Sequence, residues 1–334
     1  MKTQKFKTSL LTGRLSERDA RRYFSHLGWF AFIFMALSSL AVSIISRVAY
    51  ALSPEIYEHW LFGELLSPFA FYVIALPVAL IPLFRLPRIV PNREKMPLSH
   101  WCQGLSICLF LMMLGNYVSA IVLTIIESYT GVATQNPVEA TTSKTPLWGT
   151  FVFIVVLAPV IEEIVFRKIL CRRLLPLGEG YAVVLSSACF ALAHGNFYQL
   201  FYAFTLGCFF SFIYIKTGKL RYTVLYHMAI NFIGAFLSPI IYDKADLEAL
   251  SENFVIHAGN ILPLIGFLWF WLITTGGAVL GAFIIIKKRR SIHLYEGLIP
   301  PPEKRAFRCI ITSSGVIASL ALFSLILSAS AFNQ

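Results

Sequence analysis

The sequence predicts an all-α membrane protein, a bundle of about eight or nine transmembrane helices. Hydrophobic residues make up 57% of the 334 residues and charged residues only 13%, whereas a soluble domain carries about 25% charged residues. The apolar residues lie in long blocks, and one crossing of the bilayer needs roughly 20 mostly apolar residues. These two observations argue against a water-soluble globular protein.

Nine apolar blocks are candidate spans. The fifth is short for a full crossing, and the eighth is long enough to tilt strongly or to extend past the bilayer. The predicted spans are 27–50, 66–84, 100–126, 147–170, 181–196, 198–216, 223–241, 257–286 and 309–331. The chain therefore divides into a basic arm (1–26), three N-terminal spans (27–145), a core of four spans (146–241) and two C-terminal spans (242–334).

Charges alternate between the predicted loops. The arm and the loops after spans two, four, six and eight are rich in Lys and Arg. The intervening loops are acidic and carry Glu55, Glu58, Glu64, Glu139, Asp243, Asp246, Glu248 and Glu252. By the positive-inside rule the N-terminus lies in the cytoplasm, and we expect a multi-pass protein of a bacterial cytoplasmic membrane. The net charge of +11 belongs to these loops, so we predict the lipid bilayer and not nucleic acid as the partner.

Few ionisable residues lie deep inside the apolar blocks, where a charge costs at least ~2.5 kcal/mol. Of the 17 acidic residues only Glu162 and Glu163 do so, and of the seven histidines only His194 and His227. Counted from nearby basic residues at about 1.5 Å per residue, both histidines, Glu162 and Asn231 lie at similar depth on neighbouring spans. We therefore expect these side chains to meet.

Helical spacing gives the two adjacent carboxylates different roles. Glu162 and Glu163 point about 100° apart, so both cannot face one centre equally. Glu163 and Arg167 are separated by four residues, the spacing of an ion pair on one helix face. We expect Glu163 and Arg167 to support the site and Glu162 to act in it.

The histidines add acid–base and hydrogen-bonding groups. His227 and Asn231 lie one turn apart and reach the same centre, while Phe190 lies one turn before His194 and packs beside it. A carboxylate helped by an imidazole can take the proton from a water molecule. A second imidazole and an amide can donate to the oxyanion that develops on an attacked carbonyl. The set therefore suits the attack of water on a carbonyl.

Three short motifs occur in order on successive predicted spans. They are EExxxR at 162–167, FxxxH at 190–194 and HxxxN at 227–231. Together they resemble the CPBP family, the CAAX-protease and bacteriocin-processing (Abi) intramembrane proteases, which includes the type II CAAX prenyl endopeptidase. The resemblance covers roughly residues 145–240. Each motif alone is weak, but the ordered set is specific.

The resemblance implies an intramembrane endopeptidase that cleaves a membrane-associated peptide or protein. It implies that the water is activated by Glu162 with His194 and the oxyanion stabilised by His227 with Asn231. Glu163 and Arg167 would hold the site in shape. Because the deep residues lie nearer the basic loops, we expect the active site to open to the cytoplasm.

Metal dependence is open in this family, which has been described both as metalloproteases and as glutamate proteases. A zinc ion would be held by Glu162, His194 and His227. The sequence has no HExxH motif, in which one helix supplies two zinc ligands and a base. We therefore favour a mechanism without a cofactor and keep zinc as the alternative.

Two other functions fit parts of the pattern. A proton-coupled transporter would place broken or polar helices in both halves of the chain, whereas here the unusual residues cluster in four consecutive spans. A catalytically silent membrane scaffold would need neither histidine nor Glu162. Loss of proteolysis on substitution of Glu162 would separate an enzyme from both.

Overall fold

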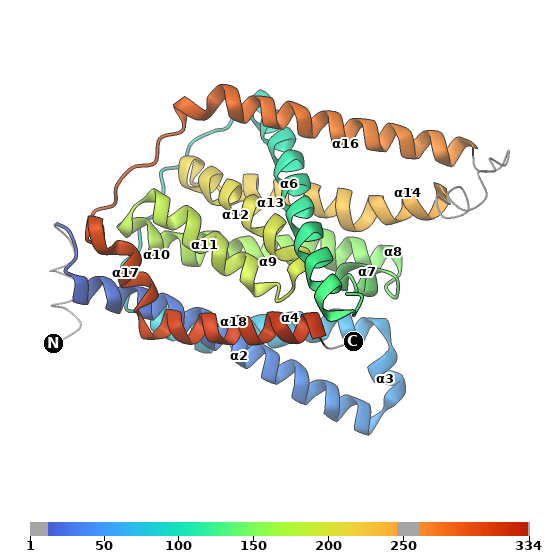
Figure 1. The fold of residues 1–334 in the computed structure, drawn as a ribbon, viewed down its shortest axis with the longest axis horizontal. Coiled ribbons are helices and arrows are strands. Elements are labelled where there is room, and N and C mark those ends of the chain that lie inside the picture. The colour runs from blue at the N-terminus through green and yellow to red at the C-terminus, as the bar shows by residue number, and fades with distance from the viewer. Residues whose placement is uncertain (1–12, 246–260, 333–334) are drawn as a thin grey trace.

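The computed structural model describes residues 13–245 and 261–332, and every element it names there is helical (Figure 1). The predicted all-α bundle is confirmed. The first part of the basic arm (1–12) and the segment 246–260 lie outside the described residues, together with the start of the predicted eighth span and with Asp246, Glu248 and Glu252.

In the described part of the chain, seven helical stretches are long and apolar enough to cross a membrane. They are α2 (Glu17–Leu52), Trp60–Leu83, α6 (Leu98–Thr130), Leu147–Leu177, α12 (Phe197–Thr217), Leu220–Ala245 and Ile261–Ser291, whose main part is α16 (Ile261–Lys288). An eighth is formed if α17 (Ala306–Ile311) and α18 (Ser314–Phe332) count as one span bent by 53°. The predicted fifth span is α11 (Glu179–Ala193), an apolar helix of 15 residues.

The second span is assembled from three segments. They are α4 (Trp60–Pro68), the π-helical segment η1 (Phe69–Ala75) and α5 (Leu76–Leu83). Short helices lie beside it and before the fourth span, namely α3 (Pro54–Glu58) and α7 (Pro137–Thr142). Prolines at 68 and 82 interrupt the regular hydrogen bonding of the second span, as expected of a residue without a backbone N–H.

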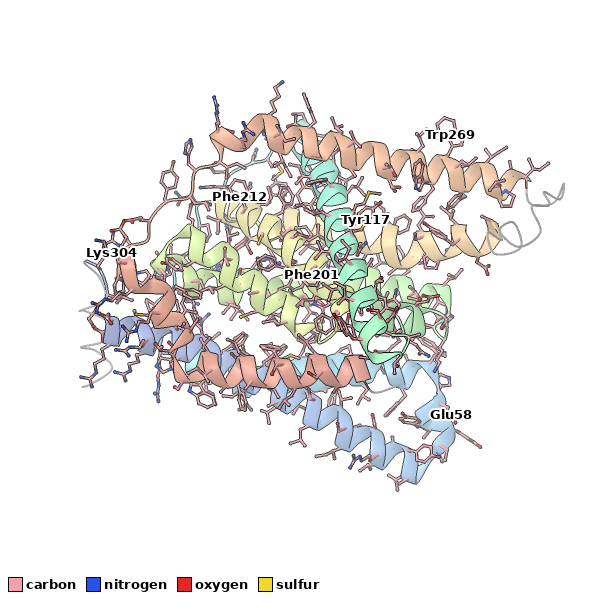
Figure 2. All side chains as sticks on the ribbon, viewed as in Figure 1. Glu58, Tyr117, Phe201, Phe212, Trp269 and Lys304 are labelled. Atoms are coloured by element: carbon pink, nitrogen blue, oxygen red, sulfur yellow. The ribbon has the colours of Figure 1, made fainter. Side chains whose placement is uncertain are left out.

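The two ends of the bundle differ in charge. One end, here the basic face, carries Arg172, Arg173, Lys216, Lys287 and Lys288; the other, the acidic face, carries Glu55, Glu58, Glu139 and Asp243. Figure 2 shows Lys304 and Glu58 at opposite ends of the molecule. Large apolar side chains such as Trp269 lie exposed on the flanks between these ends, where lipid would cover them.

The fourth span carries the acidic motif and is irregular. It runs through α8 (Leu147–Gly149), the π-helical segment η2 (Thr150–Leu157), α9 (Ala158–Glu163), a second π-helical segment η3 (Ile164–Cys171), α10 (Arg172–Leu174) and a last turn η4 (Leu175–Leu177). Wide π turns of this kind occur often at functional sites because they re-aim side chains. The two glutamates lie on the single α-helical stretch between them.

Helices α11 and α12 form a hairpin that enters from the basic face. Lys216 Nζ donates to Glu179 Oε2 at 2.5 Å, so the end of α12 and the start of α11 lie level at that face. The 15 residues of α11 rise only about 22 Å. Gly195, with φ 65°, makes the turn, and Asn196 accepts from Gln199 N at 2.9 Å to cap α12. In Figure 1, α8 and α14 (Ser238–Ala245) extend beyond this hairpin.

One expectation was wrong. Glu64 was predicted to lie in the loop before the second span, but α4 already begins at Trp60, and Glu64 is buried and accepts from Thr145 Oγ1 at 2.8 Å. Helix α3 ends at Glu58, so the apolar residues that follow it are free to form a separate helix, α4, which contains Glu64. The hydrogen bond to Thr145 offsets part of the cost of burying this polar group.

Helix α6 crosses the other helices steeply and packs closely against α12 (Figure 1). At the crossing, a Cβ added to Gly115 would lie 2.2 Å from Tyr202 Cα. Only a glycine leaves room for the two backbones at this distance. Gly115 therefore fixes how close α6 comes to the first turns of α12.

We predict that Gly115→Ala lowers the free energy of unfolding by about 1–3 kcal/mol, because the extra methyl must push two backbones apart. Thermal unfolding of the purified protein in detergent measures the effect. The matched control is Gly276→Ala on α16, where an added Cβ meets nothing within 4 Å. Equal melting temperatures for the two variants would contradict the close-packing interpretation.

Candidate active site

A single cavity of about 140 Å³ is lined by all four predicted catalytic residues. Glu162 comes from α9, His194 from the end of α11, and His227 and Asn231 from α13 (Leu220–Asn231). The volume corresponds to about four or five water molecules at roughly 30 Å³ each. The structure therefore brings together the side chains that the depth estimate placed at one level.

The two glutamates have different surroundings, as their spacing predicted. Glu163 is fully buried, accepts from Arg167 Nε at 3.1 Å through Oε2, and lies 3.3 Å from His227 Nδ1 through Oε1. Glu162 lines the cavity, its side chain is 19% exposed, and its Oε2 lies 3.6 Å from His227 Nε2. Glu162 is the carboxylate that a ligand in the cavity can reach.

His227 lies between the two carboxylates. Because a carboxylate only accepts hydrogen bonds, Nδ1 of His227 carries a proton and donates to Glu163. The opposite nitrogen, Nε2, faces Glu162 and the cavity. The ring of Phe210 lies against His227 at a centroid distance of 5.5 Å and restricts its movement.

Arg167 contacts Glu163 on the side opposite His227. The guanidinium is fully buried and lies over the Phe190 ring at 5.0 Å and the Phe210 ring at 5.9 Å. A cation over an aromatic face in a dry interior is favourable by as much as ~2 kcal/mol. The predicted pairing of Glu163 with Arg167 is present, and it ties span four to the helices that carry the histidines.

His194 is held by its own helix. Its Nδ1 lies 2.9 Å from Phe190 O, and since a carbonyl only accepts, Nδ1 carries the proton. The other nitrogen, Nε2, is left with a lone pair when the ring is neutral. Phe190 packs edge-on against the rings of both His194 (5.0 Å) and His227 (5.7 Å), so the predicted packing of Phe190 beside His194 is confirmed.

Asn231 presents its amide to the same cavity. Its Nδ2 donates to Ile154 O in η2 at 2.9 Å. An amide nitrogen carries two protons, so one remains for a group inside the cavity. This contact also links the motif on α13 to the span that carries Glu162.

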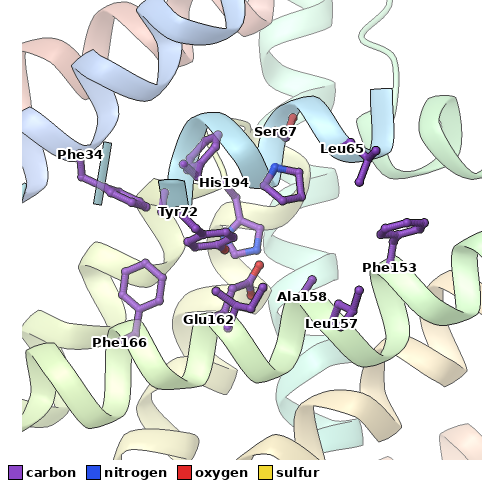
Figure 3. A pocket seen from close by; sticks show the side chains of 14 residues that line it. Phe34, Leu65, Ser67, Tyr72, Phe153, Leu157, Ala158, Glu162, Phe166 and His194 are labelled. Carbon is purple, nitrogen blue, oxygen red and sulfur yellow. The ribbon is translucent and has the colours of Figure 1, made fainter. Parts of the chain in front are cut away.

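An apolar groove of about 400 Å³ adjoins the cavity and shares Ala158, Glu162 and His194 with it. Figure 3 shows Glu162 and His194 beside aromatic side chains that include Phe34, Tyr72 and Phe166. Glu162 therefore lies at the boundary between an apolar groove and a more polar chamber.

Sequence reasoning missed most of the groove, the apolar lining of the chamber and two further polar residues of the chamber. Phe34 and Tyr72 come from the first two spans, which carry no motif, and nothing in the sequence distinguishes them from lipid-facing aromatics. Gln199 and Tyr202 on α12 line the chamber as well. Gln199 could have been predicted as a site residue from the sequence, because burying a polar amide inside an apolar span costs free energy.

A zinc ion in the chamber would need three ligands from the residues that line it. Within residues 13–245 and 261–332 no group of three or more His, Cys, Asp or Glu side chains is placed to hold a metal ion. The alternative zinc set was Glu162, His194 and His227; the contacts of the two histidines through Nδ1, with a carbonyl and with Glu163, leave Nε2 of each ring available to a ligand. A structural or catalytic zinc site needs three or four ligands converging on one point.

Comparison with known proteins supports the three motifs. Residues 144–233 match the family "Type II CAAX prenyl endopeptidase Rce1-like". The membrane-embedded CAAX protease MroQ of Staphylococcus aureus (strain USA300) is 34% identical over 115 residues, which are 31% of this chain and 45% of that protein.

The matched part thus spans less than half the length of this relative. No solved structure shows a significant match to the chain. The family match covers the segment that contains Glu162, His194 and His227, which line the cavity described above. Both matches agree with the resemblance predicted from the motifs, and residues 144–233 are similar to the type II CAAX prenyl endopeptidase family.

Proposed function

We propose that this protein is an intramembrane endopeptidase that hydrolyses a peptide bond with a water activated by Glu162. The observation that carries the proposal is that Glu162, His194, His227 and Asn231, from three helices, line one small cavity beside an apolar groove. The similarity to a protein named as a membrane-embedded CAAX protease supports it. Ionisable groups at membrane depth mark function by default because they are costly there.

The first step is the attack of water on the scissile carbonyl. A water in the chamber gives a proton to the Glu162 carboxylate, assisted by Nε2 of His194, as the oxygen–carbon bond forms. Glu162 is suited to this step because it faces both the chamber and the groove, whereas Glu163 is fully buried between Arg167 and His227. The proton then passes to the leaving amine as the carbon–nitrogen bond breaks.

The negative charge on the carbonyl oxygen needs donors that are already in place. Nε2–H of His227 and the second N–H of Asn231 supply them from one face of α13. In this role His227 carries a proton on each ring nitrogen, with Nδ1–H donated to Glu163, and Ile154 O holds the Asn231 amide. Donors fixed in this way gain more in a dry site than in water, because they need no rearrangement during the reaction.

The groove indicates the substrate class. Its aromatic and aliphatic lining, with Glu162 and His194 at one side (Figure 3), suits an apolar segment of a membrane-associated peptide or protein. The location proposed from the loop charges is a bacterial cytoplasmic membrane with the N-terminus in the cytoplasm. That the active site opens to the cytoplasm stays a prediction from the sequence. The cavities beside the chamber favour a route for water from the acidic face.

We predict that Glu162→Gln lowers kcat by about 100-fold or more, because an amide cannot take the proton from water. Cleavage of a membrane peptide by the purified protein in detergent or liposomes measures the effect. The matched control, Glu55→Gln, changes an exposed glutamate on the acidic face and should leave kcat unchanged. Full activity of Glu162→Gln, with an unchanged melting temperature, would refute the assignment.

Glu163→Gln should act mainly on stability. Removing the carboxylate leaves the buried Arg167 charge without its partner, which typically lowers the free energy of unfolding by about 3–5 kcal/mol. Thermal unfolding in detergent should therefore show a clear loss for Glu163→Gln and little change for Glu162→Gln. The same small shift for both variants would contradict the division of roles between the two carboxylates.

Removal of metal should leave the activity intact. We expect cleavage at an unchanged rate after incubation with EDTA or 1,10-phenanthroline, because the chamber offers no converging set of three ligands in the described residues. Metal analysis of the purified, active protein is the accompanying measurement. Loss of activity on chelation with recovery on added zinc would favour the zinc alternative.

A further inference from the structure

We propose that the water consumed by the reaction enters through a polar vestibule that opens toward the acidic face. The proposal rests on the proposed function, because hydrolysis requires water at Glu162. The vestibule is a cavity of about 310 Å³ between α6, α7, α12 and η5 (Phe232–Leu237). It would hold about ten water molecules at roughly 30 Å³ each.

The vestibule and the catalytic chamber are neighbours in a row of cavities. They share Gln199, Tyr202 and Asn231 as lining residues. On its other side the vestibule shares Leu123 and Tyr198 with a cavity of about 90 Å³ that reaches the segment before α7. The row therefore runs from the oxyanion side of the chamber to the loop that joins α6 to α7.

The other described cavities are poorer routes for water. The groove on the opposite side of Glu162 is lined mainly by aromatic and aliphatic side chains. A cavity of about 460 Å³ at the basic face, near Arg14 and Tyr295, shares no lining residue with the chamber. The aromatic rings of Phe190 and Phe210 lie between the chamber and Arg167. Water from the basic face would have to pass this layer.

The turn of the α11–α12 hairpin requires a polar surrounding. His194 ends α11 at the level of Glu162, since both line the same two cavities, and Glu162 lies 15 residues, about 22 Å, inside the end of the span at Leu147. Non-helical backbone at this depth is tolerated only where protein buries it or water reaches it. The turn Gly195–Asn196 therefore marks a place where the membrane interior is polar.

Hydrogen bonds around the turn continue into the vestibule. Asn196 Nδ2 donates to His194 O at 2.8 Å and to Gln199 Oε1 at 2.9 Å, and Gln199 Nε2 donates to Tyr202 OH at 3.0 Å. Tyr198 OH donates to Thr134 O at 2.6 Å. These groups form a polar wall from the loop before α7 to the chamber, with Gln199 and Tyr202 at the boundary.

A mid-span asparagine supports the same route. Asn116 lies near the middle of α6, is exposed, and lines the vestibule. An amide facing lipid at this depth would be costly, whereas an amide facing water is not. Gly234 and Ala235 of η5 line the opposite wall, and a Cβ added at Gly234 meets nothing within 4 Å.

The first test asks whether water reaches the vestibule, and from which face. A cysteine replaces Gly234 in full-length protein that carries Cys102→Ser, which removes the exposed native thiol. A charged, membrane-impermeant methanethiosulfonate is added to sealed vesicles of each orientation. Glu55→Cys and Arg289→Cys mark the acidic and basic faces, and Gly276→Cys, on an exposed stretch of α16, is the lipid-facing control.

We expect Gly234→Cys to react from the face that labels Glu55→Cys, and Gly276→Cys to stay unreacted. Labelling only from the face of Arg289→Cys, or none from either face, would overturn the proposal. This readout does not need catalytic activity. It therefore gives an answer even if the protein proves not to be a peptidase, and the two proposals can fail separately.

The second test fills the vestibule. Gly234→Leu should lower kcat at least about tenfold while KM stays nearly unchanged, because the apolar groove is untouched and only the supply of water is restricted. Gly276→Leu is the matched control and should leave both constants unchanged. Wild-type kcat in a folded Gly234→Leu protein would overturn the water route even where Glu162→Gln is inactive.

Discussion

The buried contact between Glu163 and Arg167 is the interaction on which the rest of the site depends. Both side chains are fully buried, so neither charge has water to stabilise it, and each charge is stabilised by the other. The pair also determines two further positions. Glu163 orients His227 through Nδ1, and the Arg167 guanidinium packs on Phe190, whose carbonyl holds His194. One ion pair therefore positions both imidazoles.

Much of this could be predicted from sequence, for a physical reason. A carboxylate or imidazole inside an apolar block is expensive, so its presence already carries information. Depth counted along the helices then placed Glu162, His194, His227 and Asn231 at one level, and the structure shows them around one cavity. The bundle and its approximate number of helices followed from the length of the apolar blocks, since the hydrocarbon core sets the length of a span.

Other features had no such signal. Phe34 and Tyr72 line the groove. The free energy of an aromatic side chain differs little between contact with lipid and contact with an apolar pocket, so the sequence does not distinguish a groove-lining ring from a lipid-facing ring. Glu64 was misplaced because its partner Thr145 lies 81 positions away and only the fold brings them together. The depth of the α11–α12 turn could not be predicted from the sequence either. The turn at Gly195–Asn196 carries no charge, so the positive-inside rule does not indicate on which side of the membrane, or how deep in it, the turn lies.

The geometry separates two environments that peptide hydrolysis in a membrane must combine. An apolar groove holds a lipid-soluble segment but excludes water, and a polar chamber admits water but does not hold such a segment. Glu162 and His194 line both the groove and the chamber, whereas His227 and Asn231 line the chamber and not the groove. The proposed acid–base pair thus lies where an apolar segment and water would meet. The proposed oxyanion donors lie on the polar side, where a carbonyl leaving the groove would develop its charge, and this order of groups favours a reaction at the boundary.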